Sequence, residues 1–144
     1  MKVLRISASD THNIRKQVLA PHLPLEKCVF EGDEEEQTFH LGAFVDGKLV
    51  SIASFFYHKN DTFEEENQFQ LRGMATLEEH RGKGLSSELL KVAFPVIKQN
   101  FCNLVWCDAR TSAQGFYQQV GFEKTGEVFN VEDIGEHILM YKNL

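Results

Sequence analysis

The residues with the clearest chemical potential form a short basic loop, His80–Ser86, that contains two glycines. Gly82 and Gly84 carry no side chain, so the main chain there can approach a bound anion closely. Arg81 and Lys83 add formal positive charge, and a helix that starts after the loop adds unpaired N–H groups and the positive end of its dipole. This combination predicts a cradle for a phosphate or pyrophosphate group.

The sequence on either side of the loop is consistent with a strand before it and a helix after it. Phe69–Thr76 is apolar and predicts a largely buried strand. Apolar residues after the loop recur at the spacing of one helix face, and they are Leu85, Leu89, Val92 and Val96. The glycine spacing matches neither the G-x-x-x-x-G-K-[ST] loop of nucleotide-binding proteins nor the G-x-G-x-x-G turn of dinucleotide-binding folds. The loop therefore indicates another class of phosphate-binding protein.

A second stretch, Ala109–Phe122, identifies that class when it is taken together with the loop. The run Arg81–Ser86 resembles the Q/R-x-x-G-x-G/A loop of the GNAT superfamily of N-acetyltransferases. Ala109–Phe122 resembles the later signature of the same family, N-x-x-A-x-x-[LF]-Y-x-x-x-G-F. The two signatures stand in the family's order and at its usual separation, and the resemblance covers about residues 38–142. The chain is similar to the small, single-domain bacterial members.

The resemblance implies an acetyl-CoA-dependent enzyme that transfers an acetyl group to a primary amine of a small molecule or a peptide by direct attack on the thioester. It implies that the loop amides bind the pyrophosphate, and that the main chain near Met74 pairs with the thioester arm and meets the oxyanion. It also implies that Tyr117 protonates the departing thiolate, because a phenol with a pKa near ~10 is protonated at neutral pH. The expected cofactor-binding residues are Met74, Ala75, Thr76, Arg81, Gly82, Lys83, Gly84, Leu85, Ser86 and Arg110.

Two of these residues depart from the family pattern. Ser86 stands where glycine or alanine is usual, and it keeps its N–H while adding a hydroxyl that can bond a phosphate oxygen. Arg110 stands where an asparagine usually contacts the pantetheine arm. Arginine has donors but no acceptor, so this contact is either lost or redirected, for example to phosphate.

The general base is the least determined part of the site. The candidates are Glu64, Glu65, Glu66, Glu79, His80 and His137, and an ordered water chain is an alternative to all of them. We expect His137 to be the base, because it heads the last strand beside the expected acceptor entrance; the alternative is a surface histidine without a role. Arg72 could bind an acceptor carboxylate or pair with Glu78 or Glu79.

Composition excludes several other classes of function. The 144 residues carry 15 Lys and Arg against 21 Asp and Glu, and the net charge of −6 repels nucleic acid and anionic lipid. The three cysteines form no C-x-x-C pair, which predicts reduced, buried thiols and no metal site. No run is long enough to span a membrane, and the N-terminus is too short and too charged for a signal peptide, so we expect a cytoplasmic protein.

The order of expected elements is β-α-β-β-β-α-β-α-β-β, which predicts a single α/β domain over residues 1–144 with a mixed sheet. The resemblance adds that the sheet is mostly antiparallel and contains one splayed pair of parallel strands. Asp46-Gly47 predicts a two-residue type I′ hairpin turn. Gly73, inside a strand, predicts a bulge or a close approach to the backbone.

The helix ends and the N-terminal third give further expectations. Ser9 or Asp10 is expected to cap the first helix, and Thr111 is expected to cap the third through a capping box. Pro95 predicts a break in the second helix, and Gly121 predicts the end of the third. The acidic run at residues 31–36 reads either as a solvated loop, which we favour, or as a wall of the acceptor pocket.

Two other functional classes compete with the acetyltransferase. One is a non-catalytic acyl-CoA-binding or sensing domain that keeps the cradle without turnover. The other is an unrelated anion-binding α/β protein, which would prefer ATP or NAD to coenzyme A. Members of the family are often dimers, and the apolar last strands could pair between subunits, so a homodimer is possible.

Overall fold

Seven strands form one sheet in the order β1-β2-β3-β4-β5-β7-β6 in the computed structural model, which describes residues 1–144. The strands are β1 (Lys2–Ile6), β2 (Phe39–Val45), β3 (Lys48–Tyr57), β4 (Phe69–Thr76), β5 (Leu104–Arg110), β6 (Glu123–Val131) and β7 (Gly135–Asn143). The α-helices are α1 (Ala8–Ile14), α2 (Leu85–Gln99) and α3 (Gln114–Gln119). A π-helical turn, η1 (Arg15–Leu19), extends α1, and three 3₁₀ turns are η2 (Leu25–Cys28), η3 (Glu78–His80) and η4 (Thr111–Ala113). The predicted fold class and element order are confirmed.

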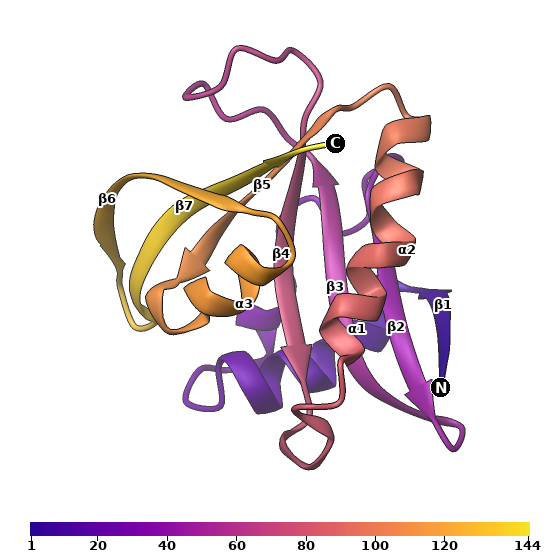
Figure 1. The fold of residues 1–144 in the computed structure, drawn as a ribbon. Coiled ribbons are helices and arrows are strands. Elements are labelled where there is room, and N and C mark those ends of the chain that lie inside the picture. Colours follow the sequence, from indigo (N-terminus) through magenta and orange to yellow (C-terminus); the bar gives the residue numbers. More distant parts are fainter.

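The feature that shapes the site is the short contact between β4 and β5. These two strands are parallel, and they pair only at Phe69 with Val105 and at Gln70 with Trp106. All other neighbouring strands in the sheet are antiparallel. Beyond Gln70 the two strands diverge, and β5, β6 and β7 turn away from β4 (Figure 1). The predicted splayed pair is confirmed.

Two local backbone predictions in the strands are also confirmed. Asp46 and Gly47 both have positive φ, 52° and 78°, as a type I′ turn requires. In β4, Ile52 pairs with Ala75 and Ser54 with Arg72, so two residues of β4 face one residue of β3. The bulge includes Gly73, whose φ is +64°, and it tilts the following main chain of β4.

The core lies between the sheet and α2, while α1 covers the opposite face (Figure 1). Leu85 and Leu89 of α2 are buried as predicted, but Val92 is 40% exposed. The buried stripe instead runs through Leu90, Ala93 and Ile97. The buried stripe is therefore wider than the predicted one and rotated relative to it.

Three predictions about helix ends are wrong. Ser7, and not Ser9 or Asp10, caps α1, and Asp10 completes the capping box from the third helical position. α3 begins at Gln114 after the 3₁₀ turn η4, without a side-chain cap from Thr111. α2 continues through Pro95 to Gln99. Pro95 and Lys91, whose carbonyl loses its usual partner, are both exposed, so water can bond that carbonyl without a break in the helix.

The predicted end of α3 at Gly121 is confirmed. Gly121 has a φ of +99°, and its N–H donates to the carbonyl of Gln118 at 3.1 Å. Phe122 N–H donates to the carbonyl of Tyr117 at 2.9 Å. This is the Schellman arrangement, in which a residue with positive φ follows the helix.

The remaining features of the fold concern the cysteines, metals and membranes. Cys28, Cys102 and Cys107 are buried and form no disulfide, as predicted. No three His, Cys, Asp or Glu side chains come together as a potential metal site. No helix combines the length and the apolar character needed to cross a membrane.

Candidate active site

The glycines of the basic loop are required by its backbone conformation. Gly82 and Gly84 have φ values of +75° and +77°, and a Cβ atom added to either would meet nothing within 4 Å. The side of the loop where a side chain would stand is therefore open. Gly84 is the N-cap of α2, and the N–H groups of residues 82–87 make no hydrogen bond inside the protein. A row of free amides at a helix N-terminus favours an anion.

Side chains brace this loop against the end of β4. Arg81 Nε donates to the carbonyl of Thr76 at 3.2 Å, which leaves the terminal nitrogens of Arg81 free. The hydroxyl of Thr76 lies 3.2 Å from that of Ser86 and 2.7 Å from that of Ser51. The loop is thereby fixed relative to the strand that feeds it. Lys83 is exposed and does not line the cavity described next.

The loop opens into a cavity of about 750 Å³, which we call the loop cavity. Its walls come from the end of β4, the basic loop, the first turn of α2, and α3. They include Met74, Ala75, Thr76, Arg81, Gly82, Gly84, Leu85, Ser86 and Tyr117. Most of the residues predicted to bind the cofactor are therefore brought together, and the edge of β4 beside them has no strand partner after Gln70. A long ligand with a diphosphate at one end fits this combination of free loop amides and unpaired strand edge.

A second cavity, of about 660 Å³, lies on the other side of β4, and we call it the sheet cavity. It is bounded by the segment from Arg15 to Glu31 and by the polar face of β4, β5 and β7. The two cavities share Met74, Ala113 and Tyr117. They therefore meet where β4 and β5 separate, and a group in one can reach a group in the other beside Tyr117.

Tyr117 is held rigidly at this junction. Its ring packs edge-on against Phe116 and Phe122, with ring centroids 5.2 Å and 5.3 Å away. Burial raises the pKa of its hydroxyl, and the nearby Cys107 adds to the effect. The hydroxyl makes no hydrogen bond within the protein, so its proton is available to a ligand in either cavity.

His137 lies in the wall of the sheet cavity and is 7% exposed, so the interpretation as a surface histidine is wrong. Its ring stacks on Phe129 with centroids 5.9 Å apart. Its Nδ1 is 2.8 Å from the carbonyl oxygen of Gly135. Since a carbonyl only accepts, Nδ1 carries the proton, and Nε2 of the neutral ring keeps a lone pair that can take up another proton.

Asp108 is a residue of the sheet cavity that the sequence reasoning missed. Partial burial raises the pKa of its carboxyl, against the opposing effects of His137 and Arg72. Asp108 and Arg110 alternate along β5 and project to the same face, and Arg110 pairs in register with His137. Charged residues at alternate positions of an otherwise apolar strand were the available signal for this polar face.

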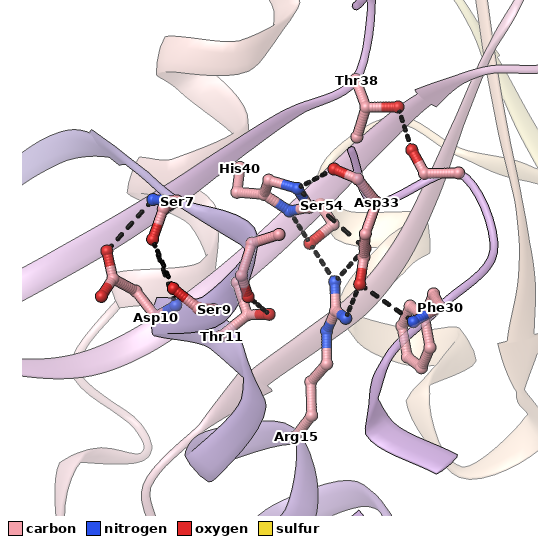
Figure 2. A network of polar contacts seen from close by, with 12 residues as sticks. Ser7, Ser9, Asp10, Thr11, Arg15, Phe30, Asp33, Thr38, His40 and Ser54 are labelled. Atoms are coloured by element: carbon pink, nitrogen blue, oxygen red, sulfur yellow. Dashed lines mark hydrogen bonds and ion pairs between the residues drawn. The ribbon is translucent and has the colours of Figure 1, made fainter. Parts of the chain in front are cut away.

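A buried network of polar side chains, also missed, surrounds Arg15, which lines the sheet cavity (Figure 2). Arg15 is 1% exposed and donates to both carboxylate oxygens of Asp33, at 2.7 Å and 2.9 Å. It also donates to the Cys28 carbonyl at 2.8 Å and to the Ser54 hydroxyl at 2.9 Å. The favoured interpretation of residues 31–36 as a solvated loop is wrong for Asp33, which is 5% exposed.

His40 completes this network in a single neutral tautomer. Its Nε2 donates to the carbonyl of Asp33 at 3.0 Å, so its Nδ1 accepts from the Ser54 hydroxyl at 2.7 Å. Burial lowers the pKa of His40, although the carbonyl and charge of Asp33 oppose this shift. Burial alone would raise the pKa of Asp33, but hydrogen bonds from Arg15 and from the Phe30 N–H lower it.

The structure places several other candidates away from the loop cavity. Arg110 lines the sheet cavity and donates to the Leu19 carbonyl at 2.9 Å, so its side chain holds η1 against β5. Glu79 lies 3.9 Å from Lys48 in an exposed pair. The acidic residues Glu64, Glu65 and Glu66 line neither cavity, whereas His80 lines the loop cavity. Arg72 pairs with neither Glu78 nor Glu79 and stacks on Phe30.

Comparison with known proteins agrees with this geometry. A model of the acetyltransferase (GNAT) family matches residues 5–122. The chain is 42% identical over 144 residues to the uncharacterized N-acetyltransferase YitI of Bacillus subtilis (strain 168). The aligned region covers 100% of this chain and 97% of that protein.

Solved structures show the same fold at low sequence identity. Escherichia coli ElaA has a TM-score of 0.78 at 19% identity and covers 99% of both chains. An aminoglycoside 6'-N-acetyltransferase complexed with coenzyme A has a TM-score of 0.78 at 10% identity, with 99% of this chain and 97% of that chain covered.

Proposed function

The chain belongs to the GNAT family of acetyltransferases, and on this premise we propose that it uses acetyl-CoA to acetylate a primary amine by direct attack of the amine on the thioester. The observation that carries the proposal is the shared wall of the two cavities. The loop cavity offers free amides for a diphosphate, the sheet cavity offers a polar face for an acceptor, and Tyr117 stands between them. A direct transfer requires the two substrates to meet in one reactive geometry, and the shared wall is where the two cavities meet.

The residues of the loop cavity bind the acyl donor in this proposal. The amides of residues 82–86 and the terminal nitrogens of Arg81 bind the pyrophosphate, and exposed Lys83 adds positive charge at the entrance. The unpaired edge of β4 from Met74 to Thr76 binds the extended arm that ends in the thioester. In this proposal the N–H of Met74, the second residue of the bulge, donates to the thioester oxygen and stabilises the oxyanion.

The chemical step then needs one proton acceptor and one proton donor. The acceptor nitrogen attacks the thioester carbon, and His137 Nε2 takes the proton that the nitrogen loses. The carbon–sulfur bond breaks, and the Tyr117 hydroxyl donates its proton to the departing sulfur. The raised pKa of Tyr117 keeps that proton in place until the thiolate forms.

Calorimetric titration with acetyl-CoA, with ATP as the control ligand, tests the donor site. We expect micromolar binding of acetyl-CoA and weaker binding of ATP. Gly84→Glu should abolish acetyl-CoA binding, because it places a carboxylate and a strained residue among the loop amides. Gly126→Glu is the matched control: Gly126 has the same φ of +77° and an equally open position, but it lines neither cavity.

Release of free thiol in the presence of a panel of amines tests the reaction itself. Thiol release that depends on an amine would support the transferase. Absence of acetyl-CoA binding, or equal binding of ATP, would contradict the proposal. Tight acetyl-CoA binding without thiol release for any amine would instead indicate a sensing domain.

A further inference from the structure

Two arginines of the sheet cavity stack on one aromatic ring. The guanidinium carbons of Arg15 and Arg72 lie 3.8 Å and 4.3 Å from the centroid of Phe30. Two guanidinium groups cannot share one face of a ring at these distances, so they occupy its two faces. Arg72 also lies 5.5 Å from the ring of Phe56. Aromatic rings therefore hold both side chains in place.

The two arginines differ in their hydrogen bonds. Arg15 is fully buried, and its terminal nitrogens are taken up by Asp33, Cys28 and Ser54. Arg72 is half-buried and makes no hydrogen bond or ion pair within the protein. Its nitrogens are not sealed away from solvent, in contrast to Arg15 Nε. Arg72 thus presents a fixed but unpaired guanidinium to the sheet cavity.

The charged groups around Arg72 do not neutralise its guanidinium group. Burial lowers its pKa, and the positive charge of Arg15 lowers it further. Asp33, Asp108 and Glu31 oppose this shift from a distance. Asp33 is already bonded to Arg15, and neither Asp108 nor Glu31 forms an ion pair with Arg72.

We propose that Arg72 binds a carboxylate of the acceptor, so that the acceptor is an amino acid or an amino-acid derivative with a free carboxyl group. A planar guanidinium with free donors matches a carboxylate through two parallel hydrogen bonds. The proposal rests on the acetyl transfer proposed above and assigns its substrate class.

The position of Arg72 connects this recognition to the reaction. Arg72 precedes the bulge at Gly73, and the bulge leads to the Met74 amide assigned to the oxyanion. A carboxylate at Arg72 therefore places an amine a few bonds away next to the thioester. Asp108 and His137 face the same cavity from the strands across the separation, where they suit the ammonium end of the acceptor. The cavity thus offers opposite charges to the two ends of an amino acid.

The test compares matched acceptors in the thiol-release assay. The probes are the common amino acids, their amides, the amines that lack the carboxyl group, and aminophosphonate analogues. We expect the wild-type kcat/KM for the acids to exceed that for the matched amides at least tenfold. Arg72→Gln should lower kcat/KM for the acids about tenfold to a hundredfold, mainly through KM, and should leave the amides nearly unchanged. Arg72→Lys should lie between, because it keeps the charge but not the planar fork.

Arg5→Gln is the matched control, since Arg5 is an exposed arginine that lies 5.9 Å from the ring centroid of Phe39 but lines neither cavity, and it should keep the preference for acids. Acetyl-CoA calorimetry reports on the fold of each variant. If the wild-type kcat/KM for amides equals that for acids, or is highest for phosphonates, the assignment of Arg72 is contradicted but the proposed acetyl transfer is not. An equal loss for acids and amides in Arg72→Gln would also overturn it. Absence of acetyl-CoA binding by wild type would remove the proposed function and this inference together.

Discussion

Burial and one hydrogen bond set the proton positions of two side chains that line the sheet cavity, Tyr117 and His137. Tyr117 lies among Phe116, Phe122 and Cys107, where an ionised phenol is disfavoured, so the hydroxyl remains a proton donor. The carbonyl of Gly135 fixes the proton of His137 on Nδ1 and leaves Nε2 as the acceptor. The two groups therefore have opposite roles in proton transfer.

Tyr117→Phe tests the donor role. The variant keeps the packing of the ring and loses a hydroxyl without a protein partner, so we expect unchanged stability and unchanged acetyl-CoA affinity. Thiol release should slow about 10²-fold to 10⁴-fold, the usual contribution of a positioned general acid. Tyr141→Phe on β7 is the control and should keep the full rate. Full activity in Tyr117→Phe would mean that another group protonates the sulfur.

His137→Asn tests the acceptor role. Asparagine can still donate to the Gly135 carbonyl, but it cannot take up a proton, so kcat/KM for the amine should fall by about 10². Steady-state kinetics at saturating acetyl-CoA measures this change, and His22→Asn, an exposed histidine outside both cavities, is the control. An unchanged kcat/KM would transfer the role to Asp108 or to water.

Among individual residues, the sequence predicted those whose role depends only on their neighbours in the chain. The loop glycines were identifiable because positive φ and free helix amides depend on neighbouring residues. The pair of Arg15 and Asp33 was not identifiable, because the two residues lie 18 positions apart and are brought together by tertiary contacts that include Ser54 of β3. Asp33 was therefore interpreted as part of a solvated acidic loop.

At the scale of elements, the bulge in β4 controls the direction of the Met74 amide. Gly73→Ala should destabilise the protein, because alanine at a φ of +64° is strained and its Cβ would lie 3.0 Å from Phe30. We expect a loss of about 2–4 kcal/mol in the free energy of unfolding, the sum of backbone strain and steric contact. Urea denaturation measures this loss.

Gly47→Ala separates the two contributions. Gly47 has a φ of +78°, but an added Cβ meets nothing within 4 Å, so this variant should lose only the strain energy, about 1 kcal/mol. Equal losses in the two variants would show that contact with Phe30 contributes nothing.

Sequence patterns predicted the strands better than the helix ends. The hairpin at Asp46-Gly47 and the bulge at Gly73 follow from backbone requirements that glycine alone meets easily. Pro95 was predicted to break α2, yet the break depends on whether water can reach the freed carbonyl, and here both Pro95 and Lys91 are exposed. The exposure of one carbonyl is set by tertiary packing, which local propensity does not contain.

At the scale of the whole molecule, the network of Arg15, Asp33 and His40 links stability to pH. The pKa of His40 is lowered in the fold, so the unfolded chain takes up a proton first as the pH falls. The contribution of His40 is complete above the unfolded value of about 6.5 and is lost as the pH falls from there toward the folded value. The pKa of Asp33 is also lowered, but its contribution is lost only below the unfolded value of about 3.9.

Urea denaturation at pH 7.5, 6.5 and 5.5 checks this linkage. Wild type should lose stability across the series, and His40→Gln should lose less, because glutamine can donate to the Asp33 carbonyl without titrating. His22→Gln, at an exposed position, should follow wild type. Parallel curves for wild type and His40→Gln would contradict the role of His40.

The short pairing of β4 with β5 also divides the sheet mechanically. Strands β1 to β4 form one plate and β5 to β7 form another, and the ladder between the plates consists of two residue pairs at one end. A ligand in the loop cavity touches β4 and α2 on the first plate and α3 on the second, so it connects the two plates at the point where they separate. Because a ligand that binds only the native state stabilises it by mass action, amide exchange throughout β5–β7 should slow when the donor binds, including at residues that the donor never contacts.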